Sequence, residues 1–100
     1  MADTFQDPIA TASLNWFDSS GQLHIRVYVS DGYNVIERCA DGNGWTDGTL
    51  NVPGTQISAT CWTASDGTHI RVYATSDDGT VEWCQNPGST SWTQGAFTIG

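Results

Sequence analysis

Residues 24–28 read HIRVY, and residues 69–73 read HIRVY again, 45 positions further along the chain. Glu37 and Glu82 lie 45 positions apart too, as do Cys39 and Cys84. A second matching pair, GWTDG and SWTQG, follows at 44–48 and 91–95. The chain is therefore two copies of one unit of about 45 residues, a length typical of a four-stranded β-propeller blade.

Each unit contains four runs with β-type alternation, separated by turn clusters. Asp-Gly pairs dominate these clusters, because glycine accepts the positive φ that tight hairpins require. No stretch has helical periodicity, so the predicted class is all-β. Residues 51–54 are predicted to link the units. We predict an N-terminal extension at 1–8, a first blade at 9–52 and a second at 53–100. The expected strands are 9–16, 23–29, 34–39, 43–50, 56–63, 69–75, 80–85 and 90–98.

Two blades cannot close a propeller, because each blade packs both faces against neighbours. A ring of several identical chains joined head to tail solves this problem. Three chains would give six blades, whereas two or four chains would give four or eight, and composition alone does not choose among them.

The charge balance excludes several partners. The chain has 3 basic and 11 acidic residues and a formal net charge of -8. Nucleic-acid binding needs clustered Lys and Arg, and anionic membranes recruit polybasic segments. No apolar run approaches the roughly 20 residues that cross a bilayer. The first residues lack the cationic start and apolar core of a secretory signal, which leaves the export route undetermined.

One Arg and one Glu lie inside the strands of each unit, at equivalent positions: Arg26 with Glu37, and Arg71 with Glu82. Charges in half-buried strands are costly unless they are paired. One interpretation is an ion pair that joins adjacent strands. The other is a polar fork for a ligand with neighbouring hydroxyls, because Arg supplies planar donors and Glu supplies two acceptors.

The tryptophans support the second interpretation. Trp45 and Trp92 follow turns, where an indole can offer its face to a ligand and its N–H to a hydroxyl. Packing between blades is the alternative. Trp16 and Trp62 end the first strand of each unit and fit either core or pocket wall.

Metal and enzyme chemistry have little support. The His residues lack a ligand pattern such as Cys-x-x-Cys, so no metal or other cofactor is expected. The three cysteines are interpreted as small, buried, unpaired hydrophobes. A glycosidase needs two carboxylates flanking one bond, and we expect no second strand carboxylate beside Glu37 or Glu82.

These motifs resemble the fucose-specific six-bladed β-propeller lectins of the Aleuria type, and more closely the short two-blade, trimeric bacterial members of the Ralstonia lectin type. The resemblance rests on the two HIRVY segments, IERC at 36–39, VEWC at 81–84 and the ends at 45–48 and 92–95. It implies a homotrimer, fucosylated glycans as partners outside the cell, and no enzymatic activity.

The resemblance also implies the site residues. Arg26, Glu37 and Trp92 would form a fucose site within one chain, whereas Arg71 and Glu82 would be completed by Trp45 of a neighbouring chain. Thr49 and Ala96 would flank these pockets, and Ile25 and Ile70 would line them. Ala40 and Gln85 stand where the family often has an aromatic residue. A structural or engineered propeller module with impaired pockets is therefore the alternative.

Overall fold

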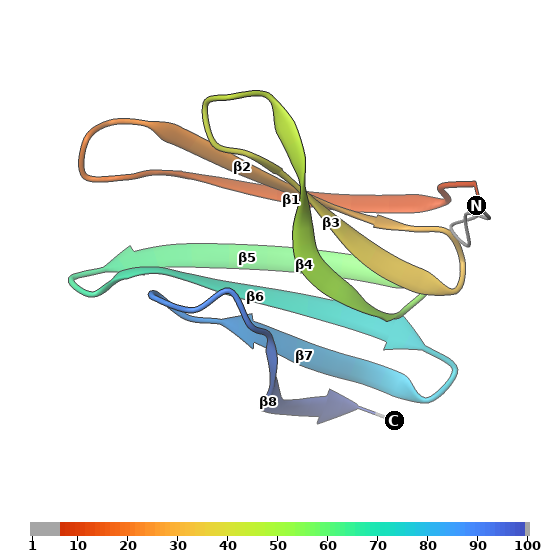
Figure 1. Cartoon of the computed structure of the whole chain (residues 1–100). Helices are drawn as coiled ribbons and strands as arrows, with labels where there is room; N and C mark the ends of the chain where they lie inside the picture. The colour runs from red at the N-terminus through yellow and green to blue at the C-terminus, as the bar shows by residue number, and fades with distance from the viewer. Residues whose placement is uncertain (1–6, 100) are drawn as a thin grey trace.

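The computed structural model describes residues 7–99, which form two four-stranded antiparallel sheets (Figure 1). No helix occurs among these residues. Each sheet is a meander of consecutive strands, so the expected all-β class and the two blades are confirmed. Sheet 1 contains β1 (Ala10–Phe17), β2 (Leu23–Ser30), β3 (Asn34–Ala40) and β4 (Trp45–Pro53). Sheet 2 contains β5 (Gln56–Ala64), β6 (Gly67–Ser76), β7 (Gly79–Gln85) and β8 (Thr93–Ile99).

The two sheets pair their strands in the same register. Tyr28 lies opposite Glu37 in sheet 1, and Tyr73 lies opposite Glu82 in sheet 2. A register shift occurs at each Glu in the pairing with the last strand, between Ile36 and Arg38 in sheet 1 and between Val81 and Trp83 in sheet 2. Repeat-equivalent side chains therefore occupy equivalent places in the two blades.

Two strand boundaries differ from those expected by three residues. β4 continues to Pro53, so the connection between the sheets is Gly54–Thr55 rather than residues 51–54. Proline is tolerated there because Pro53 ends an outer strand and forms its last pair, with Asn34. β8 begins at Thr93 rather than at residue 90, which leaves Trp92 in the preceding loop. Most of the predicted extension, residues 1–6, lies outside the described residues.

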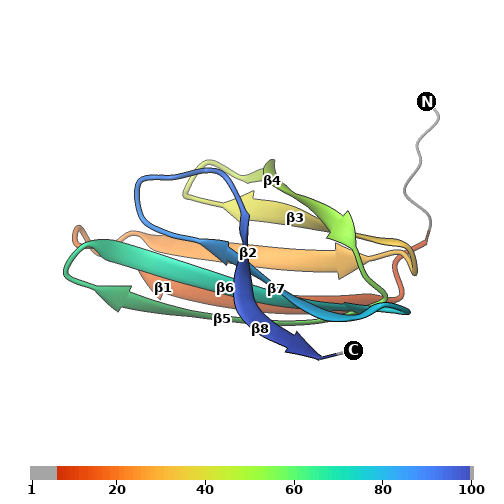
Figure 2. The same ribbon diagram turned by 90° about the horizontal axis from the view of Figure 1, so that it is seen from below.

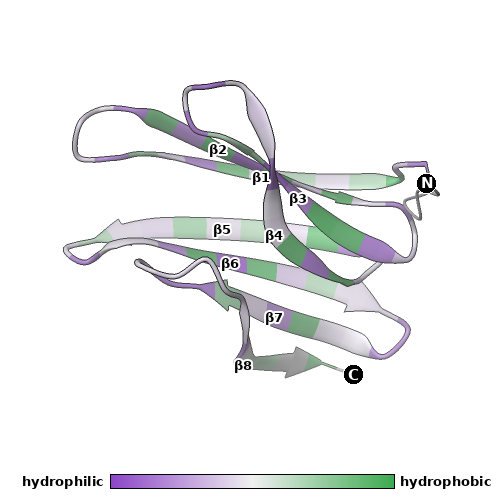
Figure 3. Ribbon diagram, viewed as in Figure 1, coloured by the Kyte–Doolittle hydropathy of each residue, from purple (hydrophilic) through white to green (hydrophobic). Residues whose placement is uncertain are grey.

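The core lies where the second sheet covers one face of the first. Figure 3 shows hydrophobic and hydrophilic residues alternating along the strands, so each strand supplies one apolar row. The sheets are in contact mainly through β1 and β5, which run side by side in Figure 1. The core cluster combines both sheets: Leu14, Tyr28, Val35, Leu50 and Val52 from sheet 1, and Ile70, Val72 and Ala74 from sheet 2.

The connection between the sheets holds them close. A Cβ at Gly54 would lie 2.9 Å from a methyl of Val35 and 3.1 Å from Ala74. The carbonyl of Gly54 also accepts a 2.7 Å hydrogen bond from the buried Ser30 hydroxyl. Seen from below, the strands of the two sheets lie in flat layers, with β4 along the upper side and β8 passing across the front (Figure 2). A short glycine connection therefore fixes how the first blade meets the second.

Candidate functional site

The Arg26 guanidinium is held by three groups of sheet 1. It lies over the Trp16 ring at 4.9 Å from the ring centre, and its Nη1 donates to Asp41 Oδ1 at 2.8 Å. The same nitrogen donates to the carbonyl of Ile25 at 3.0 Å. Burial is the largest single influence and lowers the pKa of Arg26, but the hydrogen bond to Asp41 and the nearby negative charges, those of Asp41 and Glu37 among them, together outweigh it and raise that pKa. The guanidinium is therefore a fixed cation.

Glu37 is a buried carboxylate, only 3 % exposed. Its Oε2 accepts a 2.9 Å hydrogen bond from the Tyr28 hydroxyl, and its Oε1 accepts a 3.0 Å bond from the Thr49 amide. Arg26 Nε lies 3.9 Å from Oε2. Arg26 and Glu37 thus form an ion pair, but the shorter contact of Arg26 is to Asp41. Arg26 and Glu37 are therefore not joined by a short salt bridge, and their donor and acceptor groups lie side by side.

His24 links two carboxylates on the same face. Its Nδ1 lies 2.6 Å from Asp41 Oδ1 and its Nε2 lies 2.8 Å from Asp18 Oδ2. Two carboxylate partners require two N–H groups, so the ring is an imidazolium. The hydrogen bonds to Asp18 and Asp41 raise the pKa of His24. The ring also stacks on Trp16, with centroids 5.1 Å apart. His24 is therefore a structural cation, as expected for a residue without a metal pattern.

A cavity of about 200 Å³ opens above this polar group, and both sheets line it. Arg26, Glu37 and Thr49 come from sheet 1, Gln85 comes from sheet 2, and Thr90 comes from the loop between β7 and β8. Gly48 lies at the floor, where a Cβ would collide with the Glu37 carboxylate. The cavity offers a cation, an acceptor and hydroxyl or amide groups within a small space, which suits a polyhydroxylated ligand.

Trp92 stands beside this cavity, on the loop that precedes β8. Its ring meets Tyr28 edge-on with centroids 6.2 Å apart, and its Nε1 donates to the Thr49 hydroxyl at 3.0 Å. The sequence suggested that this N–H would serve a ligand hydroxyl, but Thr49 accepts it instead. The half-buried indole thus packs against the blades and also lies next to the cavity.

Sheet 2 carries the same polar group in equivalent positions. Arg71 lies over the Trp62 ring at 4.8 Å, and its Nη1 donates to Asn86 Oδ1 at 3.0 Å. Glu82 accepts hydrogen bonds from the Tyr73 hydroxyl at 2.8 Å and from the Phe97 amide at 3.2 Å. These bonds, with that of Tyr73 first, lower the pKa of Glu82.

The remaining predicted pocket residues lie in one row on the opposite face of each sheet. Ile25 pairs with Ala40, and Ala40 pairs with Trp45, so these three side chains share a face of sheet 1. In sheet 2, Ile70 pairs with Gln85, and Trp92 lies in the loop before β8. The row of sheet 2 reaches the Arg26 cavity through Gln85. The row of sheet 1 lies on an open face, where Trp45 is 50 % exposed. Ala96 lies in β8, at the position that Thr49 has in β4.

Sequence reasoning missed two carboxylates of this site. Asp41 and Asp47 line the cavity with Glu37, and Asp47 lies in β4, so the expectation of no second strand carboxylate was wrong. Asp41 lies beside Gly42 and was interpreted only as a turn residue. Asp47 forms a 2.9 Å ion pair with Arg38. Burial acts to raise the pKa of Asp41, but the hydrogen bonds from His24 and Arg26 outweigh it and lower that pKa.

The cysteines differ slightly from expectation. Cys39 and Cys84 are buried, whereas Cys61 is only half-buried, with its Sγ 3.4 Å from the carbonyl of Asn15. All three are free thiols. Burial raises the pKa of the Cys39 thiol to about 11. Cys39 lines the cavity and therefore lies there as a neutral thiol.

Within residues 7–99, no group of three or more His, Cys, Asp or Glu side chains is arranged to hold a metal ion. The same part of the chain contains no helix long and apolar enough to span a membrane.

Comparison with known proteins gives a consistent result. Residues 2–100 match the family model described as fungal fucose-specific lectin. A fucose-specific lectin of Aspergillus oryzae is 36 % identical over 84 residues, which cover 77 % of this chain and 27 % of that protein. Fucose-specific lectin g276 of Arthrobotrys oligospora is 31 % identical over 88 residues, covering 84 % of this chain and 23 % of that protein. The chain thus spans about a quarter of the length of these curated relatives.

Proposed function

Because the chain belongs to the fungal fucose-specific lectin family, we propose that it is a lectin that binds L-fucose and fucosylated glycans in the cavity between its sheets. The observation that carries the proposal is that Arg26 and Glu37 line this cavity together, while Trp92 is hydrogen-bonded to Thr49, another residue of the lining. Its targets are glycans outside the cell, on surfaces where neighbouring fucose residues are available.

The chemistry of the cavity fits a sugar. Arg26 has further N–H donors beyond those given to Asp41 and Ile25. Glu37 has free lone pairs beside Tyr28 and Thr49, and charged acceptors form strong hydrogen bonds with hydroxyls. An indole beside these groups suits the C–H face of a sugar ring. Arg26 and Glu37 would bind the hydroxyls, and Trp92 would cover the apolar side.

The same groups argue against hydrolysis. A glycosidase requires one carboxyl group with a raised pKa to protonate the leaving oxygen. Asp41 is held as an anion by Arg26 and His24, which lower its pKa, and Asp47 is paired with Arg38. The proposal is therefore a binding protein without catalytic activity and without a cofactor.

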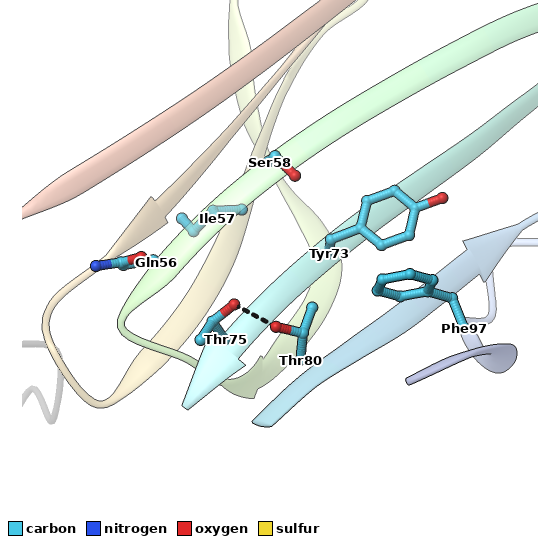
Figure 4. A pocket seen from close by; sticks show the side chains of 7 residues that line it. All are labelled: Gln56, Ile57, Ser58, Tyr73, Thr75, Thr80 and Phe97. Carbon is cyan, nitrogen blue, oxygen red and sulfur yellow. Dashed lines mark hydrogen bonds between the residues drawn. The ribbon is translucent and has the colours of Figure 1, made fainter. Parts of the chain in front are cut away.

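A second site needs a second chain. In sheet 1, Tyr28 and Val35 are fully buried and Leu50 is 2 % exposed, because sheet 2 covers them. At equivalent positions in sheet 2, Tyr73 and Thr80 are only half-buried and Phe97 is 44 % exposed. These three line an open hollow of about 510 Å³ with Gln56, Ile57, Ser58 and Thr75 (Figure 4).

The chain also carries the surface that fits this hollow. Ile70, Val72 and Ala74 of β6 are buried where they cover sheet 1. Their equivalents Ile25, Val27 and Val29 in β2 are half-buried and have no covering sheet. Sheet 1 of a second copy would cover sheet 2 of the first by repeating the contact within the chain, and would bring Trp45 to Arg71 and Glu82. Three copies would close a six-bladed ring, within the known range of propellers.

Such a ring would be multivalent. Two sites per chain and several chains per ring raise the effective concentration on a glycan surface, so modest single-site affinities combine. A structural module with impaired pockets would form the same ring but would not respond to fucose.

Arg26→Ala and Arg71→Ala test the assignment of the two sites. Each variant should lose one class of fucose site, and the double variant should lose binding to immobilised fucosylated glycans while its mass by analytical ultracentrifugation is unchanged. Retention of glycan binding by the double variant would remove the proposed mechanism and favour another surface. Release of the aryl group from an aryl fucoside would contradict the non-enzymatic assignment.

A further inference from the structure

Thr49 lines both the cavity that contains Arg26 and Glu37 and the neighbouring hollow that contains Trp92. Its amide donates to Glu37 Oε1 at 3.0 Å, and its hydroxyl donates to the Thr90 carbonyl at 2.6 Å. The hydroxyl oxygen also accepts from Trp92 Nε1 at 3.0 Å. One residue of β4 therefore connects the carboxylate of sheet 1 with the aromatic residue of sheet 2. We call the contacts among Thr49, Thr90 and Trp92 the Thr49 clasp.

The clasp acts on a segment that has no strand partner of its own. Thr90 and Trp92 lie in the loop between β7 and β8, before the first residue of β8. Edge-on packing against Tyr28 supports one side of the indole. The hydrogen bond from Nε1 anchors the far end of the side chain. It therefore fixes the rotation of the indole ring against Tyr28.

The equivalent clasp is impossible at the second site. Ala96 stands where sheet 1 has Thr49, and a methyl group accepts no hydrogen bond. Asn43 occupies the position equivalent to Thr90. Trp45, which a second copy would bring to Arg71 and Glu82, would have no hydroxyl partner from this residue. A second position also differs between the two rows: sheet 1 has the small Ala40 where sheet 2 has Gln85.

We propose that Thr49 is a positioning residue that presets Trp92 and makes the site within the chain the tighter of the two. The inference rests on the proposed function, because it concerns the affinity of that same site for fucose. An aromatic wall that is already fixed loses less conformational freedom when the sugar binds, and such preorganisation increases affinity. The chain therefore presents two unequal classes of fucose site.

Calorimetry with methyl α-L-fucoside tests the effect on binding, in a Glu82→Gln background that weakens the second site. Thr49→Val keeps the shape of the side chain but removes the hydroxyl, and should weaken binding roughly threefold to tenfold. Thr49→Ser should restore it. Thr63→Val is a matched control, because within the described part of the chain the side-chain partner of its hydroxyl is Thr68, at 3.1 Å. Equal affinity of the Thr49→Val protein and its parent would overturn the positioning role.

Nuclear magnetic resonance of the indole N–H groups tests the clasp without any sugar. The Trp92 N–H should exchange with solvent several times more slowly in the wild type and in Thr49→Ser than in Thr49→Val, whereas the Trp45 N–H should not change. Equal exchange of the Trp92 N–H in all three proteins would overturn the clasp, even if fucose binds. If the wild type gave no heat of binding with the fucoside, the proposed function would be overturned instead. The exchange rates would still test the clasp in that case.

Discussion

The two blades share one scaffold but differ in what covers it. Tyr28 and Tyr73 donate to equivalent glutamates at 2.9 and 2.8 Å, although Tyr28 is fully buried and Tyr73 is only half-buried. The Arg, Glu and His side chains hold their geometry in both blades, so the geometry comes from contacts within each sheet. The covering sheet buries Tyr28 and places Trp92 against it. The comparison supports our proposal that a blade prepares half of a fucose site and that its neighbour completes it.

The largest effect should come from a charge on the open face. Phe97→Arg places a cation on the exposed aromatic of sheet 2, which packs edge-on against Tyr73 at 5.6 Å. Burying an unpaired charge is costly, so the ring should not assemble, and the number of fucose sites per chain should halve. Sedimentation and calorimetry measure the two results. Tyr33→Arg, in an exposed turn, is the control and should assemble; an assembled Phe97→Arg protein would show that this face is free in the ring.

A methyl group at the cavity floor should affect one site. In Gly48→Ala the new Cβ collides with the Glu37 carboxylate, which is buried and held by hydrogen bonds from Tyr28 and Thr49. Overpacking of this kind costs about 1–3 kcal/mol, and displacement of Glu37 should weaken the site within the chain by at least roughly tenfold. Gly95→Ala makes the same collision with the half-buried Glu82. In the Phe97→Arg background, which keeps the chain monomeric, chemical denaturation should give Gly95→Ala the smaller stability loss, and equal losses there would contradict the unequal covering of the two blades.

Removal of a single hydroxyl should have a smaller effect that depends on burial. Tyr28→Phe leaves the Glu37 carboxylate without its phenolic donor, and hydrogen bonds to charged groups contribute about 1.5–3 kcal/mol. Tyr73→Phe removes the equivalent bond at a more exposed position. In urea titrations the two variants should lose similar free energies of unfolding when the ring is assembled. Their losses should differ when Phe97→Arg keeps the chain monomeric. A difference that persists in the assembled protein would contradict the covering of Tyr73.

The smallest effect concerns one charge beside His24. Sheet 1 has Asp41 where sheet 2 has Asn86, so His24 faces two carboxylates and His69 faces only Asp66. The pKa of both rings is raised, and that of His24 should be the higher. Asp41→Asn should lower the pKa of His24 toward that of His69, and Asn86→Asp should raise the pKa of His69. Titration of the ring protons by nuclear magnetic resonance measures both pKa values. An unchanged pKa of His24 in Asp41→Asn would contradict the ion-pair assignment.

The sign of the stability change with pH follows from the same shifts. A raised His24 pKa stabilises the fold below the ordinary value of 6.5, and this contribution is lost as the pH rises through the folded pKa. Lowered pKa values of Asp18 and Asp41 stabilise the fold above the ordinary value of 3.8, and these contributions are lost at lower pH. The network should therefore stabilise the fold most between these two ordinary pKa values. Asp41→Asn should reduce the loss of folding stability as the pH rises above that range.

The sequence predicted the fold well because two strong local signals agree. Alternating strands and Asp-Gly turns fixed most strands to within three residues, and glycines such as Gly32 and Gly67 do adopt positive φ, at 94° and 121°. The last strand failed at its start because Trp92 and the residues before it are held by Thr49, a contact between the sheets that no local pattern contains.

The site was less predictable for physical reasons. Arg26 and Glu37 stood out because charges inside strands need partners, but Asp41 resembled any turn aspartate, and only its contacts with His24 and Arg26 reveal its role. Gly48 carries no side-chain signal, although its missing Cβ makes room for Glu37. The unequal burial of Tyr28 and Tyr73 is also invisible in two nearly identical segments, because it depends on which sheet has a neighbour.

The central claim is that each blade completes the site of its neighbour, and calorimetric titration with methyl α-L-fucoside at a known chain concentration tests it most directly. We predict heat that saturates near two sugars per chain, with the site formed by Arg26 and Glu37 filling first. Saturation near one sugar per chain in a protein that sediments as a closed ring, or no heat at all, would contradict the account.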